Sequence, residues 1–319
     1  MAEAGAPPAV AVWVGMLTFR RPDRLGIGLG EVIAQVEDLA AATGRPGHVL
    51  VVDNDPEASA RDYVSGLAAT HPVVRYVHEP TPGIAAARQR CLEEAADADL
   101  LAFIDDDEIP EAGWLANLVA AWERYDRPGA VAGAIRPRYL SAPPAFVEAG
   151  GFFVRAEYPD GTPVPAAPTS NLLVDLAQVH RFGLGFETRL GLRGGEDTLF
   201  TRQLVAAGGR IVFCSDAPVH DLVPDDRNTR EWVLRRAWHM GNTHSFITLW
   251  LTRGRVRRLA VRVGLAAGGL VRAVVGGAQA VAGRAAGSLS REAKGLRMHW
   301  RGRGRIRGAV APAPPEYQR

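Results

Sequence analysis

The most constraining feature of the sequence is an apolar run, Leu100–Ile104, that leads directly into the four acids Asp105–Glu108. A run of this length is typical of a buried β-strand. The acids cannot follow it inside, because burying an unpaired carboxylate costs several kcal/mol. We therefore expect them at a sheet edge, where Asp105 and Asp107 point the same way and hold Mg²⁺ or Mn²⁺ together with ligand phosphates. The alternative is an ordinary acidic loop at a strand end.

Other strand-like runs alternate with helical stretches along the chain. Strands are expected at residues 12–17, 48–52, 73–77 and 99–104, and helices at about 30–42 and 84–96. This alternation predicts an α/β fold with a mostly parallel, Rossmann-like central sheet and flanking helices. Ligands of such sheets bind at the carboxyl ends of the strands. Asp53 and Asp55 follow one of these strands, so two acidic clusters are expected at one edge.

Five short motifs resemble, in order and spacing, those of family 2 glycosyltransferases. They are Thr18–Pro22, Val51–Asp55, Pro82–Arg88, Phe103–Glu108 and Gly194–Asp197. Within the family, the chain is most similar to the branch that contains glucosyltransferases of bacterial succinoglycan synthesis. The resemblance covers about residues 10 to 250. It implies a GT-A fold, a nucleotide-sugar donor (a UDP-sugar is favoured) and inversion at the anomeric carbon.

The resemblance also implies a set of donor-binding residues. These are Thr18, Arg20, Asp53, Asp55, Arg88, Asp105, Asp106, Asn171 and Arg227. Asp53 would read the base or ribose, although Asp-Asn-Asp is also good turn chemistry. Arg88 would clamp the diphosphate, or else be an exposed helix arginine. Asp106 and Glu108 point away from Asp105 and Asp107 in an extended chain, so we expect them to support those residues or to be solvated.

The acid pair Glu196-Asp197 precedes a stretch with helical spacing. By the resemblance, Asp197 removes the proton from the attacking hydroxyl and Glu196 helps to position the acceptor or the base. An acidic cap on a helix N-terminus is the alternative. The metal, Mn²⁺ or Mg²⁺, would be held by Asp107, Asp105 and His220, although a lone histidine is more often structural.

Three further expectations concern the surroundings of this site. Arg227, and Arg235 or Arg236, are candidates for a mobile loop that closes on the diphosphate. Trp114 belongs to an apolar stripe of helical spacing that we expect to be mostly core, although Trp114 is close enough to the acids to meet a sugar face. The turn signal Asp160-Gly161 predicts a hairpin, and Asn171 either contacts the donor sugar or has an ordinary loop role.

The charge of the chain is divided unevenly, although its net charge is only +2. Residues 1–252 have 22 Arg, no Lys and 33 acids, whereas residues 253–307 have 14 basic residues and the single acid Glu292. We therefore expect a disordered leader (1–9), a GT-A domain (10–250), a basic helical segment (251–307) and a flexible tail (308–319). The start of the chain is not expected to be a signal peptide.

The basic segment allows three interpretations. Its apolar run, residues 263–283, is rich in Gly and Ala and contains Arg272, so it is a weak candidate for spanning a membrane. Arg255, Arg258, Arg262, Arg272 and Arg284 fall within one arc of a helix, which suits an anionic membrane surface. The alternatives are ordinary surface helices or, with few aromatics to stack on bases, nucleic acid, which we do not expect.

These observations predict a metal-dependent inverting glycosyltransferase. Its acceptor would be a lipid-linked saccharide or a small molecule, in polysaccharide, glycolipid or natural-product biosynthesis. Only two cysteines occur, which favours a reducing compartment, so we expect the cytoplasm or the inner face of the cell membrane. The alternatives are a sugar nucleotidyltransferase, which would normally have a glycine-rich basic loop for a triphosphate, and a non-catalytic sugar-binding scaffold.

Overall fold

The computed structural model describes residues 10–311, which form two compact units. Unit 1 comprises the residues up to 135, 156–191 and 196–221, and unit 2 comprises 136–155, 192–195 and the residues from 222 onward. The division does not coincide with the predicted boundary near residue 250, because α8 (Arg230–Leu251) belongs to unit 2. The predicted leader lies outside the described residues. The predicted tail begins inside α10 (Leu289–Val310), and its last eight residues also lie outside them.

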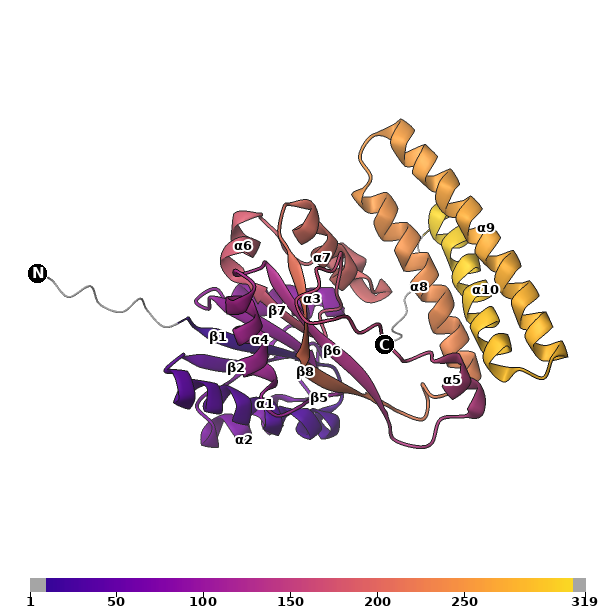
Figure 1. Cartoon of the computed structure of the whole chain (residues 1–319). Coiled ribbons are helices and arrows are strands. Elements are labelled where there is room, and N and C mark those ends of the chain that lie inside the picture. The colour runs from indigo at the N-terminus through magenta and orange to yellow at the C-terminus, as the bar shows by residue number, and fades with distance from the viewer. Residues whose placement is uncertain (1–9, 312–319) are drawn as a thin grey trace, which may run out of the picture. The chain divides into compact units, whose positions relative to one another are not determined.

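The elements follow one another along the chain as Figure 1 labels them. The first group is β1 (Val12–Thr18), α1 (Pro22–Thr43), β2 (Gly47–Asp53), α2 (Arg61–Thr70), β3 (Val74–His78), α3 (Ile84–Glu94), β4 (Leu100–Asp105), β5 (Glu108–Pro110) and α4 (Trp114–Arg124). The second is β6 (Ala130–Tyr139), α5 (Ala145–Gly150), β7 (Asn171–Asp175), α6 (Leu176–Arg181), the 3₁₀ segment η1 (Thr188–Arg193), α7 (Glu196–Ala206) and β8 (Ile211–Val223). The helices α8, α9 (Arg255–Ala285) and α10 complete the chain.

The strands form one eight-stranded sheet in the order β3-β2-β1-β4-β7-β6-β8-β5. The strands β3, β2, β1 and β4 are parallel to one another. The pairs β4–β7, β7–β6 and β8–β5 are antiparallel. The predicted parallel α/β sheet is therefore confirmed for the first half, and an antiparallel half follows it.

Residues of the parallel strands alternate between two apolar cores, one on each face of the sheet. Val14 and Val51 face a core formed with α1, α2 and α4, whereas Trp13 and Val52 face a core formed with α3, α6 and α7. Burial on both faces explains why these strands read as nearly continuous apolar runs. Pro22 is the first residue of α1, so the helix begins four residues after the end of β1. Gly44, at φ 70°, ends the helix.

The segment 151–170 contains no strand, so the predicted hairpin at Asp160-Gly161 is wrong. The turn itself is present. The Gly161 N–H donates to the Phe213 carbonyl at 2.9 Å, and Pro163 forms an isolated bridge with Val212. The segment therefore hydrogen-bonds to β8 instead of folding back on itself.

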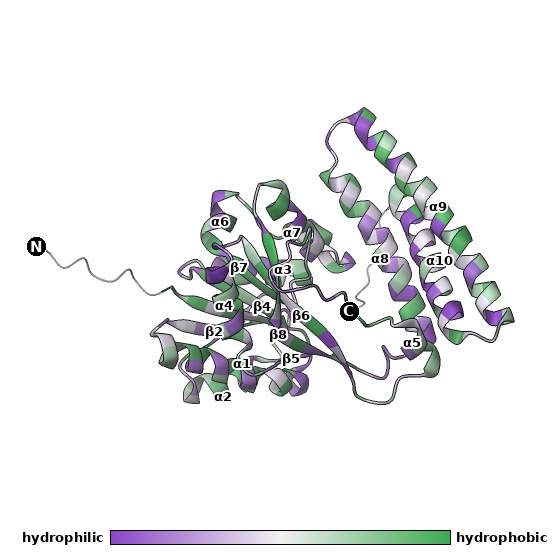
Figure 2. Cartoon of the chain, viewed as in Figure 1, coloured by the Kyte–Doolittle hydropathy of each residue, from purple (hydrophilic) through white to green (hydrophobic). Residues whose placement is uncertain are grey.

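In unit 2, α9 and α10 pack through glycines rather than large side chains. A Cβ on Gly276 would lie 2.5 Å from the backbone nitrogen of His299, and one on Gly302 would lie 2.5 Å from the backbone nitrogen of Ala273. Only glycine allows the two backbones to approach this closely. The opposite side of α9 is apolar and exposed (Figure 2). By length and composition, this helix could cross a membrane.

Candidate active site

The parallel strands bring the two predicted acidic clusters to one sheet edge. In the strand register, Thr18 lies beside Asp53 on β2, and Leu17 lies beside Asp105 on β4. The residues that follow β1, β2 and β4 are therefore neighbours, as the alternation of strands and helices predicts.

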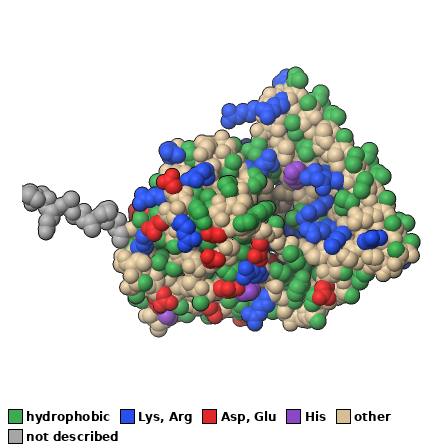
Figure 3. All heavy atoms as spheres, in the orientation of Figure 1, with side chains coloured by type: hydrophobic (Ala, Val, Ile, Leu, Met, Phe, Trp, Pro, Cys, Tyr) green, Lys and Arg blue, Asp and Glu red, His purple; other side chains and the backbone are tan. Residues whose placement is uncertain are grey.

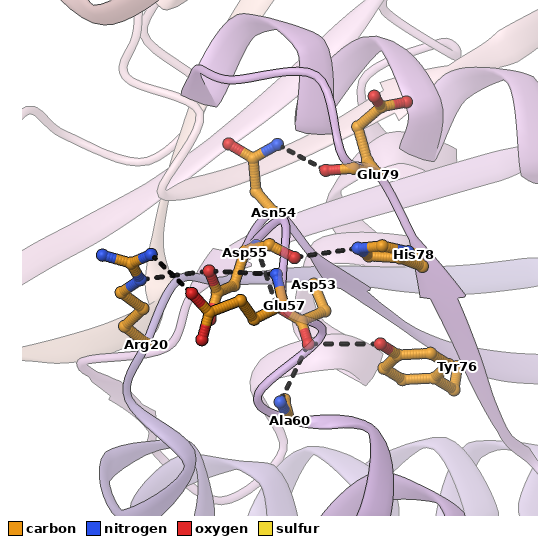
Figure 4. Close-up of polar contacts among 9 residues, drawn as sticks. All are labelled: Arg20, Asp53, Asn54, Asp55, Glu57, Ala60, Tyr76, His78 and Glu79. Atoms are coloured by element: carbon orange, nitrogen blue, oxygen red, sulfur yellow. Dashed lines mark hydrogen bonds and ion pairs between the residues drawn. The ribbon is translucent and has the colours of Figure 1, made fainter. Parts of the chain in front are cut away.

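Asp53 organises the loop that follows β2 (Figure 4). One carboxylate oxygen accepts a hydrogen bond from the Asp55 N–H at 3.0 Å. The other accepts from the Ala60 N–H at 2.8 Å and from the Tyr76 hydroxyl at 3.2 Å. The side chain is 0 % exposed. This arrangement favours the turn role of Asp53 over direct reading of the nucleotide, which stays a prediction.

Asn54 connects the end of β2 to the loop before α3, and sequence reasoning assigned it no role. Its amide nitrogen donates to the carbonyls of Glu79 at 2.9 Å and Thr81 at 2.7 Å. Its oxygen accepts from the Gly83 N–H at 3.0 Å. Because Gly83 immediately precedes α3, Asn54 fixes the start of the helix that bears Arg88. The motif contained the residue, but nothing in the sequence identified its partners.

Arg20 and Asp55 form an ion pair at the mouth of this loop, with 3.0 Å between Nε and Oδ1. Burial raises the pKa of Asp55, but hydrogen bonds from Ser59 and Arg20 outweigh it, so the pKa lies below its ordinary value. The Arg20 guanidinium also lies 3.8 Å from Glu57 and remains half exposed. Its exposed part is available to a ligand.

The acids after β4 are held by residues that follow β1. Thr18 donates a hydrogen bond to Asp106 at 2.9 Å, and the Arg21 guanidinium lies 3.7 Å from Asp106 and 3.6 Å from Asp107. Burial, with repulsion from Asp107, raises the pKa of Asp106 to about 7, against the effects of Arg21 and Thr18. The buried Glu108 accepts a hydrogen bond from the Asp105 N–H. Asp106 and Glu108 therefore support the cluster and are not solvated; the contact with Arg21 was not anticipated.

Arg88 connects this cluster to the acid pair of α7. One terminal nitrogen pairs with Glu196, and the other lies 3.2 Å from Asp105. Arg88 is only 4 % exposed, which excludes the exposed-arginine alternative. Burial raises the pKa of Glu196 to about 7 although Arg88 lowers it, and Asp197 adds repulsion. The second oxygen of Glu196 has no hydrogen-bond partner among the described residues.

Asp197 is the second residue of α7 and is half-buried. Its carboxylate accepts hydrogen bonds from the backbone and hydroxyl of Thr198. Gly194 and Gly195 have φ of 75° and 92°, which turns the chain into the helix. A carboxylate at this position is favoured by the helix dipole, and it remains partly accessible to a substrate.

The predicted metal ligands are only partly assembled. Within residues 10–311, no three His, Cys, Asp or Glu side chains form a group able to hold a metal ion. The His220 ring nitrogen lies 3.0 Å from Glu111. Asp105 and Asp107 still fit Mg²⁺ or Mn²⁺, because such ions commonly take one or two carboxylates and complete their shell with water and phosphates. Ligation by His220 remains a prediction.

Asn171 and Trp114 are buried components of the sheet and its core. The Trp114 ring N–H donates to the Asn171 oxygen at 2.8 Å, and the Asn171 amide donates to the carbonyls of Ala134 and Ala217. Both side chains are 0 % exposed. The suggestion that Trp114 meets a sugar is therefore wrong, and the hydrogen bonds of Asn171 favour a structural role. Arg227 lies in unit 2, in the turn before α8, and its role stays a prediction.

Comparisons with known proteins agree with this geometry. The model of glycosyl transferase family 2 matches residues 13–147. The succinoglycan biosynthesis protein ExoM of Rhizobium meliloti (strain 1021) is 34 % identical over 232 residues, which are 72 % of this chain and 73 % of ExoM. A glucosyl-dolichyl phosphate glucuronosyltransferase of Haloferax volcanii is 23 % identical over 217 residues, 65 % of this chain and 69 % of the relative.

Two solved structures share the fold. A crystal structure of GalNAc-T7 with UDP, GalNAc and Mn²⁺ aligns with a TM-score of 0.54 and 15 % identity, over 81 % of this chain and 55 % of that one. A structure of S. aureus TarS, residues 1–349, aligns with a TM-score of 0.52 and 12 % identity, over 89 % of both chains. The sheet with its flanking helices is thus a GT-A-like fold. With a relative as similar as ExoM over most of both chains, the chain belongs to glycosyl transferase family 2 and is a glycosyltransferase.

Proposed function

We propose that the chain transfers a sugar from a nucleoside-diphosphate donor, with a UDP-sugar favoured, to an acceptor hydroxyl with inversion. One observation carries the proposal: Arg88 pairs with both Asp105 after β4 and Glu196 at the start of α7. This contact brings the expected donor end and the expected base into one cluster. The structure of GalNAc-T7, which contains UDP and Mn²⁺, supports the donor and metal class through the shared fold.

Asp105 and Asp107 would hold Mg²⁺ or Mn²⁺ at the donor end, with His220 as the predicted third ligand. The bound ion would neutralise charge on the donor's diphosphate. Arg20 and Arg21 lie beside the same edge and offer cationic groups to the phosphates. Arg88 is already engaged by two carboxylates, so we assign it a positioning role between the donor acids and the acid pair of α7.

The transfer itself needs one base and one leaving group. Asp197 accepts the proton of the acceptor hydroxyl while that oxygen forms a bond to the anomeric carbon. The bond from this carbon to the diphosphate breaks on the opposite face, and its electrons leave with the nucleoside diphosphate. Glu196 is buried and paired with Arg88, so it is less accessible to an acceptor hydroxyl than Asp197 is.

The deciding experiment replaces the base without changing its size. Asp197→Asn should bind the donor as the wild type does but lose transfer by about 10²-fold or more. Asp62→Asn is a matched control, because Asp62 is likewise the second residue of a helix and is exposed. Donor binding by calorimetry with Mn²⁺, Mg²⁺ or EDTA tests the metal separately. Near-full transfer by the Asp197 variant would rule out the base assignment.

We further propose that the acceptor is a saccharide on a membrane lipid, in polysaccharide or glycolipid assembly. The names of ExoM and of the dolichyl-phosphate relative support this class. The apolar outer side of α9 supports a membrane location, since Val256, Val271 and Val281 are each more than half exposed. Transfer assays with detergent-extracted lipid acceptors and with free oligosaccharides would separate this class from a soluble acceptor.

A further inference from the structure

Four arginines of unit 2 form a cluster between neighbouring helices, which we call the arginine cluster. Arg297, Arg301 and Arg305 recur every four residues along α10 and are half-buried. The exposed Arg272 of α9 lies close enough to repel Arg301 and Arg305. Residues at this spacing share one face of a helix. Arg297 donates to the carbonyl of Gly151 at 2.9 Å, and Arg301 contacts the sulfur of Met240 on α8 at 3.3 Å.

Among the residues that the structure describes, no acid balances the arginine cluster. Within residues 10–311, none of its four guanidinium groups forms an ion pair with Asp or Glu. Glu292, the single acid of α10, pairs instead with Arg230 at 3.0 Å. Burial, together with repulsion from Arg297, Arg272 and Arg305, lowers the pKa of Arg301 to about 10. Burial also lowers the pKa values of Arg297 and Arg305, and Arg272 adds to the effect on Arg305.

Other arginines of the same helix are placed differently. Arg303 and Arg307 are exposed, and Arg303 lies over the ring of Trp300. Exposed cations cost little, whereas like charges gathered in a half-buried position destabilise the fold unless an anion joins them. Lys and Arg side chains gather visibly over the helices of unit 2 (Figure 3). The excess of basic over acidic residues in 253–307 therefore lies on the helices of unit 2.

We propose that the arginine cluster binds the phosphate of a phosphate ester carried by an amphipathic molecule. A guanidinium fork binds phosphate oxygens bidentately. A phosphate or diphosphate has more oxygens than a carboxylate, so it can engage more of these forks at once. The amphipathic carrier follows from α9, which contributes Arg272 to the cluster and exposes a row of Val and Leu on its outer side. The inference is independent of the transfer chemistry of unit 1.

The test measures binding of the full chain to three kinds of vesicle by sedimentation. The first is phosphatidylcholine, the second is phosphatidylcholine with an equal part of phosphatidylglycerol, and the third replaces the phosphatidylglycerol by the carboxylate lipid dioleoylglycerol succinate. The variant pair Arg301→Gln with Arg305→Gln removes two charges from the cluster. The control pair Arg303→Gln with Arg307→Gln removes two charges from the exposed side of the same helix.

We expect the wild type to bind most tightly to the phosphatidylglycerol vesicles. The cluster pair should weaken this binding by about tenfold or more, whereas the affinity of the control pair should stay within about threefold of the wild type. Equal losses for both pairs, or equal binding to the carboxylate vesicles, would overturn it, because net charge alone would then suffice. Adding inorganic pyrophosphate to the vesicle-bound protein at constant ionic strength distinguishes a free phosphate from a lipid-borne phosphate as the ligand. Release of the protein means that free phosphates enter the cluster, whereas retention means that a lipid-borne phosphate is required.

The variants also need a check of folding. Removing one of several crowded cations relieves repulsion, so the melting temperature of the cluster pair should equal or exceed that of the wild type in buffer without phosphate. Should the pair fail to fold, Arg305→Gln alone repeats the vesicle measurement, since Arg305 makes fewer contacts than Arg301.

Discussion

Arg88 and Glu196 are separated by 108 residues in sequence and form a buried ion pair. Arg88 comes from α3, which packs on the parallel half of the sheet, and Glu196 is the first residue of α7. A second contact, 3.2 Å to Asp105, makes Arg88 the shared partner of two acids from different parts of the chain. The first two predictions below depend on this pair.

Replacing Arg88 by Ala should destabilise unit 1 strongly. It leaves Glu196 buried without a cation, which typically costs 3–5 kcal/mol of unfolding free energy. Arg90→Ala is the matched control on the same helix, because Arg90 is only partly buried and its pair with Glu94 should contribute less than about 1 kcal/mol. Denaturant unfolding measures both. Equal midpoints for the two variants would show that the buried pair contributes nothing.

Glu196 should make stability depend on pH. Its pKa of about 7 in the folded protein exceeds the ordinary 4.5, so the folded state binds the proton more tightly than the unfolded state. Its contribution is therefore fully present below pH 4.5 and is lost as the pH rises through 7. Relative to Glu196→Gln, the wild type should lose at most about 3 kcal/mol over this range.

The control for this measurement is Glu187→Gln. Arg189 lowers the pKa of Glu187, so the stabilisation from Glu187 is lost as the pH falls and the difference from wild type has the opposite sign. Thermal unfolding from pH 4 to pH 8 follows both variants. A flat difference between wild type and Glu196→Gln would contradict the raised pKa.

Asp53→Asn should act mainly on the loop after β2. An amide has one acceptor oxygen where the carboxylate has two, so the N–H of Asp55 or of Ala60 loses its partner. We expect a loss of about 1–3 kcal/mol and faster hydrogen exchange in residues 54–60. Tyr76→Phe removes one weaker bond and should cost about 1 kcal/mol. A stable Asp53 variant that no longer binds donor would instead support the nucleotide-reading role.

The packing of α9 against α10 makes a prediction for unit 2. Gly276→Ala would place a methyl group 2.5 Å from the His299 nitrogen, so the helices must separate and stability must fall by several kcal/mol. Gly268→Ala, on the same helix but with nothing within 4 Å, should stabilise by about 0.5–1 kcal/mol. The melting temperatures of the two variants test this prediction. Equal shifts would contradict the close approach of the α9 and α10 backbones at Gly276.

The parallel half of the fold could be predicted because its information is local. The strands β1, β2 and β4 are buried on both faces and so form apolar runs, and the acids that follow β2 and β4 were placed correctly at the sheet edge. The antiparallel half could not be predicted in this way. The pairing of β4 with β7 joins Phe103 to Leu172, and no local pattern specifies such a distant partner. The predicted hairpin at Asp160-Gly161 was wrong for the same reason, since Gly161 bonds to the distant Phe213 of β8.

The candidate site shows the same limit at the level of side chains. The acids and arginines of the site could be predicted from the sequence, because charged side chains beside buried strands need a partner or a ligand. Their partners depend on loop conformation: Asp53 bonds to the Ala60 backbone, and Asn54 to the loop at residues 79–83. The apolar stripe of Trp114 was expected to be mostly core, and it is; only the alternative contact with a sugar, suggested by closeness in sequence to the acids, was wrong.

The hydrogen bond from Gly83 to Asn54 has a consequence for how such an enzyme can change over time. It joins the loop after β2 to the start of α3, and α3 holds α7 through Arg88. Under the roles proposed above, donor binding and proton removal would be mechanically linked, so a substitution that reshapes one would shift the other. New specificities should therefore arise more readily through exposed positions that touch neither Asn54 nor Arg88, where variation carries no cost to the reaction.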